Sequence, residues 1–477
     1  MTDLISDSVG GRIVECNDEF FAEAVNLLRT AAPVWREAEY TDRGKWMDGW
    51  ETRRRRDSGH DWCVIALGIP GRITAITVDT SHFTGNYPES FSLDGCGVGS
   101  DDNVPAASWV EIVPRNGLTG DTTATFGVED PHRITHLRLN IFPDGGVARL
   151  RVEGDPIPGV DEVCPDRAAT DLVSSLIGGE ALNTSDYHYS PPSNLLRPTE
   201  PVGMWDGWET RRRRGPGNDW ATLRLGLPGV VEEVEVDTRH FKGNAPGWVS
   251  ISVGDDGEVW EEVVTRAEVG PDRVNIVVPG TPAHAAFLRL DIHPDGGVAR
   301  LRVRGTPDTE PAGRLRLAYL NALFDDQAKA FFHSACAATT WVGHMTAARP
   351  FPDVETLLST ADAVFDQLGE ADWLEAFAGH ARIGDRGDRM TDREQAGTAE
   401  ADDQVIAELA AVNRAYEESM GFTYIVYAAG KTAAQMLEIA RRRMVNTREE
   451  EIGNAAAEQK SITRTRLRRM LCMEATR

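Results

Sequence analysis

The sequence predicts two antiparallel β-sandwiches of the jelly-roll kind, followed by an all-α domain. Three observations lead to this fold class: a long internal duplication, a period-two alternation of apolar residues within each copy, and a change to helical apolar spacing after residue 315. At roughly 100–200 residues per domain, a chain of 477 residues has room for several domains, each with its own core.

The duplication is visible as blocks that recur in the same order. DGWETRRRRDSGHDW, which starts at Asp48, returns as DGWETRRRRGPGNDW from Asp206. VDTSHFTGNYP returns as VDTRHFKGNAP, and NIFPDGGVARLRVEG returns as DIHPDGGVARLRVRG. Solenoid repeats are only about 20–50 residues long, so this much longer period indicates two homologous domains, residues 1–157 and 158–307.

Within each copy, short stretches alternate between apolar and polar residues, as in CVIALG, ITAITVDT and LRLNIF of the first. Clusters of Gly, Pro, Asn and Asp separate these stretches. The pattern predicts many short strands joined by polar turns, which is typical of an antiparallel sandwich. The sandwich cores are predicted to contain matched tryptophans, namely Trp50 and Trp208, Trp62 and Trp220, and Trp109 and Trp260.

The segment GTPDTEPAGR is rich in Pro and Gly, and residues 308–314 are predicted to form a linker. From residue 315 to residue 477 the chain is rich in Ala, Leu, Glu and Arg. Apolar residues recur there at three- and four-residue spacing, for example in VETLLSTADAVFDQL. This spacing predicts an all-α domain.

Composition excludes several function classes. The net charge of −25 opposes the attraction to phosphates that drives nucleic-acid binding. No uncharged run reaches the length of about 18 residues that a membrane-spanning helix needs, and the first residues lack a secretory layout, so we expect a cytoplasmic location. The six cysteines form no CxxC pair and are expected to be reduced. A homo-oligomer is compatible with the sequence.

DGWETRRRR, DTSHFTGNYP and PDGGVARLRV, each present twice with small changes, resemble the duplicated signature of the allantoicase family over residues 1–305. The resemblance implies galactose-binding-like jelly rolls that hydrolyse allantoate to (S)-ureidoglycolate and urea. A site for this reaction must hold one carboxylate and two ureido arms, protonate the departing nitrogen and deliver water.

Side chains suited to these tasks occur at matched positions in both copies. We expect catalytic roles for Asp48, Glu51 and His82 of the first copy and for Asp206, Glu209 and His240 of the second. Substrate binding is expected of Asn86, Asn244, Arg149, Arg300, Arg138 and Arg289, since the arginine fork suits carboxylates.

Structural roles compete with these functional ones. If Arg53–Arg56 lie on a strand, their side chains alternate, so at most two of them can face a common pocket. PDGG, at Pro143 and at Pro294, has the composition of a tight turn. FTGN and FKGN are also turn-like, which could place Asn86 and Asn244 in left-handed conformations.

A metal site is not indicated. His132 and His136 lie four residues apart, but their segment is predicted as a strand, and no HExxH motif or acidic loop occurs. We therefore predict no metal ligand, although a divalent metal for the hydrolase remains open.

The C-terminal region resembles a second family, the decarboxylase of 2-oxo-4-hydroxy-4-carboxy-5-ureidoimidazoline (OHCU). The resemblance rests on TTWVGHMTAARPF, AFAGHARIGD, REQAG, GFTYIVYAAGK and the helical tail that ends in RTRLRRML. It implies conversion of OHCU to (S)-allantoin without a cofactor. Catalytic roles fall to His380, Glu394 and Arg466, and substrate contacts to Gln395, Thr391 and the strand-like stretch near Ile425. Thr391 and Glu394 also have the spacing of a helix capping box. Ala381 stands where the family has a proline.

Together the two resemblances predict a bifunctional enzyme of purine and ureide catabolism with small ureide substrates. The two steps are not consecutive, because an allantoinase must act between them. The alternative is an OHCU decarboxylase that carries a non-catalytic ureide- or carbohydrate-binding platform. The matched charged residues of both copies favour catalysis, and whether each copy has its own site stays open.

Overall fold

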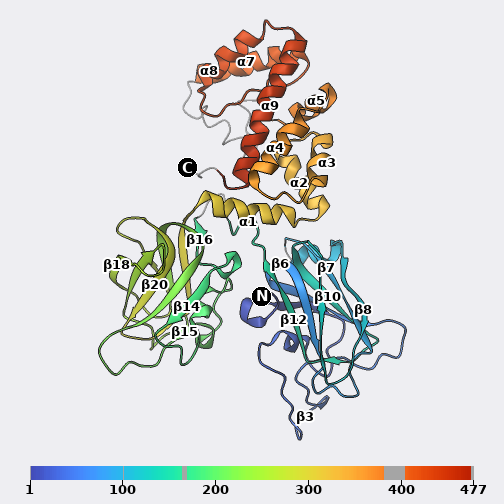
Figure 1. Cartoon of the computed structure of the whole chain (residues 1–477), viewed down its shortest axis with the longest axis vertical. Helices are drawn as coiled ribbons and strands as arrows, with labels where there is room; N and C mark the ends of the chain where they lie inside the picture. Colours follow the sequence, from blue (N-terminus) through green and yellow to red (C-terminus); the bar gives the residue numbers. More distant parts are fainter. Residues whose placement is uncertain (1, 100, 164–168, 381–402, 474–477) are drawn as a thin grey trace. The chain divides into compact units, whose positions relative to one another are not determined.

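The computed structural model describes residues 2–99, 101–163, 169–380 and 403–473. It divides into two compact units with the boundary between Ala322 and Leu323 (Figure 1). The first unit contains two β-sandwiches and one helix, and the second unit is helical. This architecture confirms the predicted fold class.

Each sandwich is built around one strand of 19 residues, β6 (Asp61–Asp79) in the first copy and β16 (Asp219–Asp237) in the second. The first residues of β6 pair with β2 and β10, whereas its last residues pair with β9 and β12. The two ends of this one strand therefore pair with different sets of strands, and the strand connects the two sets. The strand order is β1-β12-β6-β10-β7-β8, and the second copy repeats it as β13-β22-β16-β20-β17-β18.

The other strands have the following bounds. The first copy contains β1 (Thr2–Asp3), β2 (Arg12–Cys16), β3 (Tyr40–Thr41), β4 (Gly44–Lys45), β5 (Trp50–Glu51), β7 (Ser90–Cys96), β8 (Val110–Gly117), β9 (Thr123–Gly127), β10 (Ile134–Phe142), β11 (Gly146–Val147) and β12 (Arg149–Pro156). The second copy contains β13 (Thr170–Asp171), β14 (Glu180–Thr184), β15 (Trp208–Glu209), β17 (Trp248–Gly254), β18 (Glu261–Glu268), β19 (Val274–Val277), β20 (Ala283–His293), β21 (Gly297–Val298) and β22 (Arg300–Pro307).

The tryptophan prediction is correct for one matched pair only. Trp50 and Trp208 are fully buried in the two cores. The other matched tryptophans are partly exposed, and two of them lie beneath guanidinium groups: Arg138 is 5.0 Å from the Trp109 ring centre and Arg289 is 4.6 Å from that of Trp220. A cation placed over an indole face stabilises it at a half-exposed site, which apolar patterning does not reveal.

The predicted linker 308–314 is helical, because α1 (Thr309–Asn321) begins there. Proline is tolerated in the first turn of a helix, so Pro311 does not prevent it. Asp308 precedes the helix and bonds His284 of the second copy at 3.1 Å. Near the other end, the Ala322 carbonyl accepts a hydrogen bond from the Arg133 amide of the first copy, 2.7 Å away. Residues of both copies thus hold α1.

The helical unit contains α2 (Asp325–Ala335), α3 (Thr339–Ala347), α4 (Val354–Phe365), α5 (Glu370–Ala378), α7 (Asp403–Met420), α8 (Ala433–Arg443) and α9 (Arg448–Met470). Capping boxes start two of them, with Thr432 and Gln435 at α8 and Thr447 and Glu450 at α9. The long helix α9 packs against α2, α4 and α5 (Figure 1). Among the described residues, no helix is long and apolar enough to cross a membrane.

A fully buried carboxylate organises the region between α7, α8 and α9. Glu451 accepts hydrogen bonds from the Tyr416 hydroxyl at 2.5 Å and from Arg443 Nε at 2.8 Å. Burial by itself would raise the pKa of Glu451. These two hydrogen bonds and those from Asn446 and Asn454 nevertheless hold the pKa below its ordinary value. Arg443 also donates to the Ile425 carbonyl at 2.7 Å, so the stretch predicted as strand-like is an irregular segment bonded to side chains.

Replacement of Arg443 by alanine should lower the free energy of unfolding of the helical unit by about 3–5 kcal/mol, because Glu451 would remain buried without its counter-charge. Urea denaturation followed by circular dichroism measures this. Arg442→Ala, at an exposed position of the same helix, is the matched control. Equal losses in the two variants would contradict a stabilising role of the buried pair.

Candidate active sites

In each sandwich a buried aspartate–arginine pair connects the DGWET block to the PDGGVARLRV block. Arg149 Nη2 donates to Asp48 Oδ2 at 2.8 Å, and its Nη1 and Nε donate to the carbonyls of Asp48 and Ala31. The second copy repeats this arrangement with Arg300, Asp206 and the Thr199 carbonyl. Because each guanidinium nitrogen already donates to the chain, this geometry suits a positioning role for these residues.

Next to this pair, a glutamate and an asparagine from different blocks meet. Asn86 Nδ2 donates to Glu51 Oε1 at 2.7 Å, and Asn244 Nδ2 donates to Glu209 Oε1 at 2.5 Å. Burial raises the pKa of Glu51 above its ordinary value, and the hydrogen bond from Asn86 partly opposes this shift. A carboxyl group with a raised pKa is suited to donate a proton near neutral pH.

The two histidines adopt the left-handed conformation that was considered for the asparagines. His82 and His240 both have φ of 71°, whereas neither Asn86 nor Asn244 has a positive φ. Each histidine amide donates to an aspartate at 2.8 Å, Asp121 and Asp272 respectively. A non-glycine residue in this region costs about 1–3 kcal/mol and is held only by surrounding contacts, as is common at functional sites.

One loop connects His82 to the buried pair. His82 Nε2 lies 3.3 Å from the Pro33 carbonyl, and the next amide, that of Val34, donates to Asp48 Oδ2 at 3.0 Å. In the second copy Pro201 and Val202 make the same contacts to His240 and Asp206. The fold therefore brings together the aspartate, glutamate, histidine and asparagine that the sequence singled out in each copy.

The PDGG segments, which have the composition of tight turns, bend the chain at Pro143 and Pro294 and lead into short strands that begin at Gly146 and Gly297, and they border this site. Gly145 has a φ of 143°, and a Cβ there would lie 2.6 Å from the Pro88 nitrogen. The Gly146 amide donates to the Asn86 carbonyl at 2.7 Å. The glycines thus allow the turn to approach the segment that carries Asn86.

Arg138 and Arg289 are not brought to this site by any bond of the described residues. Two guanidinium nitrogens of Arg138 donate hydrogen bonds to Asp94, at 2.8 Å and 3.1 Å. Two of Arg289 donate to Asp291, at 2.9 Å and 3.0 Å. Arg138 lies four residues before the end of β10, about 13 Å along the strand from the PDGG turn. Their substrate-binding role therefore has no support from the geometry.

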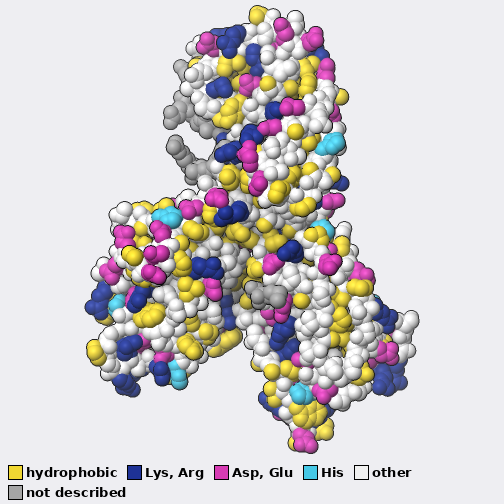
Figure 2. Space-filling model, viewed as in Figure 1, with side chains coloured by type: hydrophobic (Ala, Val, Ile, Leu, Met, Phe, Trp, Pro, Cys, Tyr) yellow, Lys and Arg dark blue, Asp and Glu magenta, His cyan; other side chains and the backbone are white. Residues whose placement is uncertain are grey.

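The arginine run Arg53–Arg56 is an extended loop rather than a strand. Every second arginine pairs with an aspartate, and the arginines between them do not. Arg53 pairs with Asp18 at 2.6 Å and Arg55 with Asp61 at 2.5 Å. Arg54 and Arg56 are exposed and make no hydrogen bond or ion pair with the described residues. Arg211–Arg214 repeat this pattern. Basic and acidic side chains are interspersed over the face in Figure 2.

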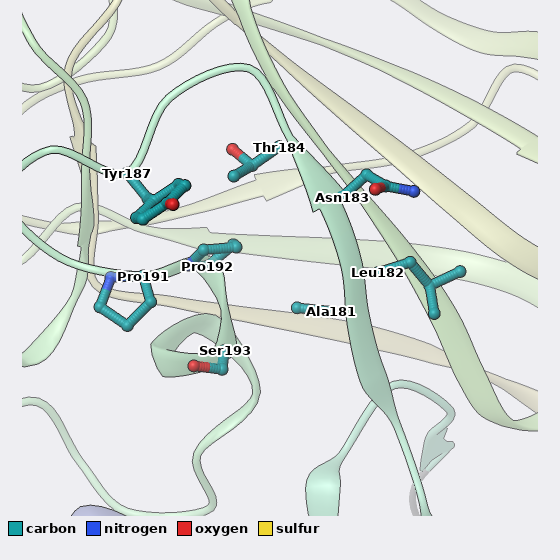
Figure 3. Close-up of a pocket in the computed structure, with 8 residues that line it drawn as sticks. All are labelled: Ala181, Leu182, Asn183, Thr184, Tyr187, Pro191, Pro192 and Ser193. Atoms are coloured by element: carbon teal, nitrogen blue, oxygen red, sulfur yellow. The ribbon is translucent and has the colours of Figure 1, made fainter.

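Cavities differ between the copies. In the first, a cavity of about 320 Å³ is lined by residues that include Glu23, Arg29, Trp46 and Met47, and Arg29 pairs with Asp48 at 3.2 Å. In the second, a cavity of about 390 Å³ lies between β14 and the segment Pro191–Ser193, with Tyr187 beside it (Figure 3). It is lined by none of the predicted site residues and by no acid or base other than Tyr187.

In the helical unit, His380 follows the end of α5 and meets α9. Its Nε2 is buried and has no hydrogen-bond partner among the described residues, and the same holds for Oε1 of the neighbouring, fully buried Gln459. Burial lowers the pKa of His380 from 6.5 to about 4, with the charge of Arg466 contributing and Gln459 opposing the shift. Buried polar atoms without partners are rare in proteins and mark a place for a ligand.

The structure adds residues that the sequence analysis missed. Gln459, Thr463 and Arg466 are buried on one face of α9, and Gln459 Nε2 donates to Thr463 Oγ1 at 3.2 Å. The spacing of four and three residues along a predicted helix could have revealed Gln459 and Thr463 as neighbours of Arg466. The buried Cys336 also lies near, since Arg466 and Thr463 both act on its pKa, which burial raises.

Three predicted decarboxylase residues, Thr391, Glu394 and Gln395, lie outside the described residues. The Ile425 carbonyl, expected to contact substrate, already accepts a hydrogen bond from Arg443.

No group of three or more His, Cys, Asp or Glu side chains arranged to hold a metal occurs in residues 2–99, 101–163, 169–380 and 403–473. His132 and His136 each pair with a different aspartate, Asp130 and Asp101, both at 3.0 Å.

Fold and sites thus define a tandem β-sandwich with paired polar sites, joined to a helical domain with a buried histidine site. The allantoicase repeat family matches residues 2–157 and 170–308, and the OHCU decarboxylase family matches residues 321–468. All of the helix α1 except its last residue, Asn321, falls in the interval that neither match covers.

Individual relatives agree with these matches. A probable allantoicase of Acinetobacter baylyi is 41% identical over 321 residues, which cover 64% of this chain and 94% of that protein. One of Pseudomonas aeruginosa is 43% identical over 323 residues, with 64% and 96% covered. A solved OHCU decarboxylase, determined with (S)-allantoin, is 28% identical and covers 31% of this chain and 99% of that chain, with a TM-score of 0.28.

The chain belongs to the allantoicase family. An OHCU decarboxylase domain is fused to its two repeats, and the chain is an enzyme of purine catabolism. The alternative of a non-catalytic binding platform is not favoured.

The depressed pKa of His380 predicts a pH-dependent stability. Between pH 6.5 and about pH 4 the unfolded chain binds a proton at His380 that the folded chain does not, so the free energy of unfolding of the helical unit should fall as the pH falls. The full effect is on the order of 3 kcal/mol. His380→Gln should remove this part of the pH dependence in urea titrations. The same slope in both proteins would contradict a buried neutral imidazole.

Proposed function

We propose that the repeats hydrolyse allantoate to (S)-ureidoglycolate and urea, and that the helical domain converts OHCU to (S)-allantoin. The observation that carries the first activity is the Glu51–Asn86 pair, which is placed beside a strained histidine and recurs as Glu209–Asn244. The observation that carries the second is His380, whose buried Nε2 has no hydrogen-bond partner among the described residues and whose pKa is lowered in part by the charge of Arg466.

For the hydrolase, we assign proton donation to the half-buried carboxyl group of Glu51. When water attacks, the departing urea nitrogen must gain a proton, and a carboxyl with a raised pKa can supply it. The carboxylate that this leaves accepts the proton that the attacking water loses, so Glu51 ends the step protonated, as it began. Asn86 orients this group through its 2.7 Å hydrogen bond. Asp48 and Arg149 keep the loops in register and do not take part in the proton transfer.

For the decarboxylase, the imidazole acts first as a proton acceptor, since it is neutral at physiological pH. Loss of CO₂ leaves an electron pair that the adjacent imine of the substrate ring holds, which removes the need for a cofactor. His380 then moves the proton of the ring hydroxyl to the former imine carbon on one face, giving a single enantiomer, and the ring nitrogen that received the electron pair takes a proton from water. Arg466 holds the anionic oxygens of the substrate. Both substrates are small ureides, and the hydrolase's requirement for a metal remains to be measured.

The purified chain should release urea from allantoate, and Glu51→Gln combined with Glu209→Gln should lower this rate by about 10²–10⁴-fold because it removes the proton donor of each repeat. The matched control is Glu89→Gln, at an exposed position whose side chain makes no bond. A coupled urea assay, with and without added divalent metals, measures both. No urea release by the wild type under any of these conditions would exclude the allantoicase activity.

His380→Ala should abolish the formation of optically active allantoin from fresh OHCU, with a loss of about 10²–10⁴-fold. Circular dichroism follows the product directly. His344→Ala, an exposed histidine of α3, should behave as the wild type does. A wild-type rate in the His380 variant would remove this residue from the mechanism.

A further inference from the structure

The two repeats differ at the turn that carries the strained histidine. In both copies an aspartate side chain at the end of the long strand accepts a hydrogen bond from the backbone amide two residues later. The Ser81 amide donates to Asp79 Oδ1 at 2.8 Å, and the Arg239 amide donates to Asp237 Oδ1 at 2.9 Å. The turn is therefore the same, and the residue before the histidine differs, serine in one copy and arginine in the other.

This substitution changes what the aspartate can bind. The Arg239 guanidinium donates to Asp237 Oδ2 from Nε at 2.9 Å and from Nη2 at 2.6 Å, and Asp237 is buried. Asp79 is only partly buried, and its carboxylate has the Ser81 amide as its partner and no ion pair among the described residues. The carboxylate of the first copy is thus free to accept further N–H groups.

A second substitution accompanies the first. Arg239 also forms an ion pair with Glu200, which directly precedes the Pro201 whose carbonyl contacts His240. The corresponding residue of the first copy is Ala32, since Ala31 and Thr199 make equivalent bonds to Arg149 and Arg300. Asp237, Arg239 and Glu200 form a bridge across the His240 site, which we call the latch. The first copy lacks two of its three members.

The loop after this point is also different. In the first copy it is about three times as long (residues 33–47 against 201–205), contains β3 and β4, and places the Trp35 ring 5.9 Å from the His82 ring. The same insertion lines the cavity of about 320 Å³ beside Arg29. Trp205 of the second copy, in contrast, is 72% exposed and packs on no histidine.

The guanidinium of Arg239 has the shape of a ureido arm, because both are planar and present two N–H groups on one edge. We propose that Asp79 binds a ureido arm of the substrate, so that the first repeat carries the working hydrolase site, whereas the latch fills the equivalent place in the second repeat. This inference rests on the proposed allantoicase activity. The second repeat then has a structural role. It keeps the same loop architecture, but its Asp237 carboxylate is occupied by Arg239 and does not bind substrate.

The test exchanges the latch between the repeats of the full chain. Ala32→Glu with Ser81→Arg installs it in the first repeat and should lower kcat/KM for urea release from allantoate by about tenfold or more, the loss expected when a charged hydrogen-bond acceptor is withdrawn. Glu200→Ala with Arg239→Ser removes it from the second repeat and should leave the rate at the wild-type level or above. Ala32→Ser with Ser81→Ala is the uncharged control and should also keep the wild-type rate.

A second pair of variants separates recognition from folding. Asp79→Asn should raise KM and lower kcat/KM by about tenfold with little change in Tm, whereas Asp237→Asn should lower Tm and leave kcat/KM unchanged. Loss of activity on removal of the latch, or a wild-type rate in Asp79→Asn or with the latch installed, would overturn the inference. Failure of the wild type to release urea would instead overturn the proposed allantoicase activity.

Discussion

The buried ion pair of each sandwich, Asp48 with Arg149 and Asp206 with Arg300, is the contact on which the geometry of the candidate sites depends. The arginine fork binds the aspartate side chain, the aspartate carbonyl and a carbonyl of the preceding loop. A planar, charged donor accepts only a narrow range of acceptor positions, so the pair fixes the loop relative to the block that contains Glu51. Breaking such a buried pair leaves an uncompensated charge, which explains why this geometry recurs without change in both copies.

The helical unit also contains a buried carboxylate that pairs with an arginine. Glu451 is fully buried, yet it is surrounded by donors from Tyr416, Arg443, Asn446 and Asn454. The cluster fixes the irregular segment near Ile425 to α8 and α9. His380 and Gln459 differ from this cluster, because the buried atoms His380 Nε2 and Gln459 Oε1 have no hydrogen-bond partner among the described residues. A buried cluster in which every polar atom has a hydrogen-bond partner stabilises the fold. Buried polar atoms without partners can instead form hydrogen bonds with a ligand.

Duplication kept the scaffold of the two sandwiches and let its details diverge. The strand order, the ion pair, the strained histidine and the glutamate–asparagine contact are all present twice. The differences gather around the histidine turn and the loop that faces it. The fusion adds a further element, since α1 lies between the two family matches and contacts residues of both copies.

The sequence by itself determined the duplication, the β-sandwich and helical classes, both families and the blocks that supply Glu51, His82, Asn86 and His380, because these depend on local periodicity and on recurring motifs. It could not separate a buried structural pair such as Asp48–Arg149 from a reactive one, since residue type is the same in both. It did not show that a helix begins within residues 308–314, or that the residues with a positive φ are His82 and His240 rather than Asn86 and Asn244. Only the tertiary structure decided which carboxylates have free oxygens and which arginines occupy them, because that depends on contacts between residues far apart in the chain.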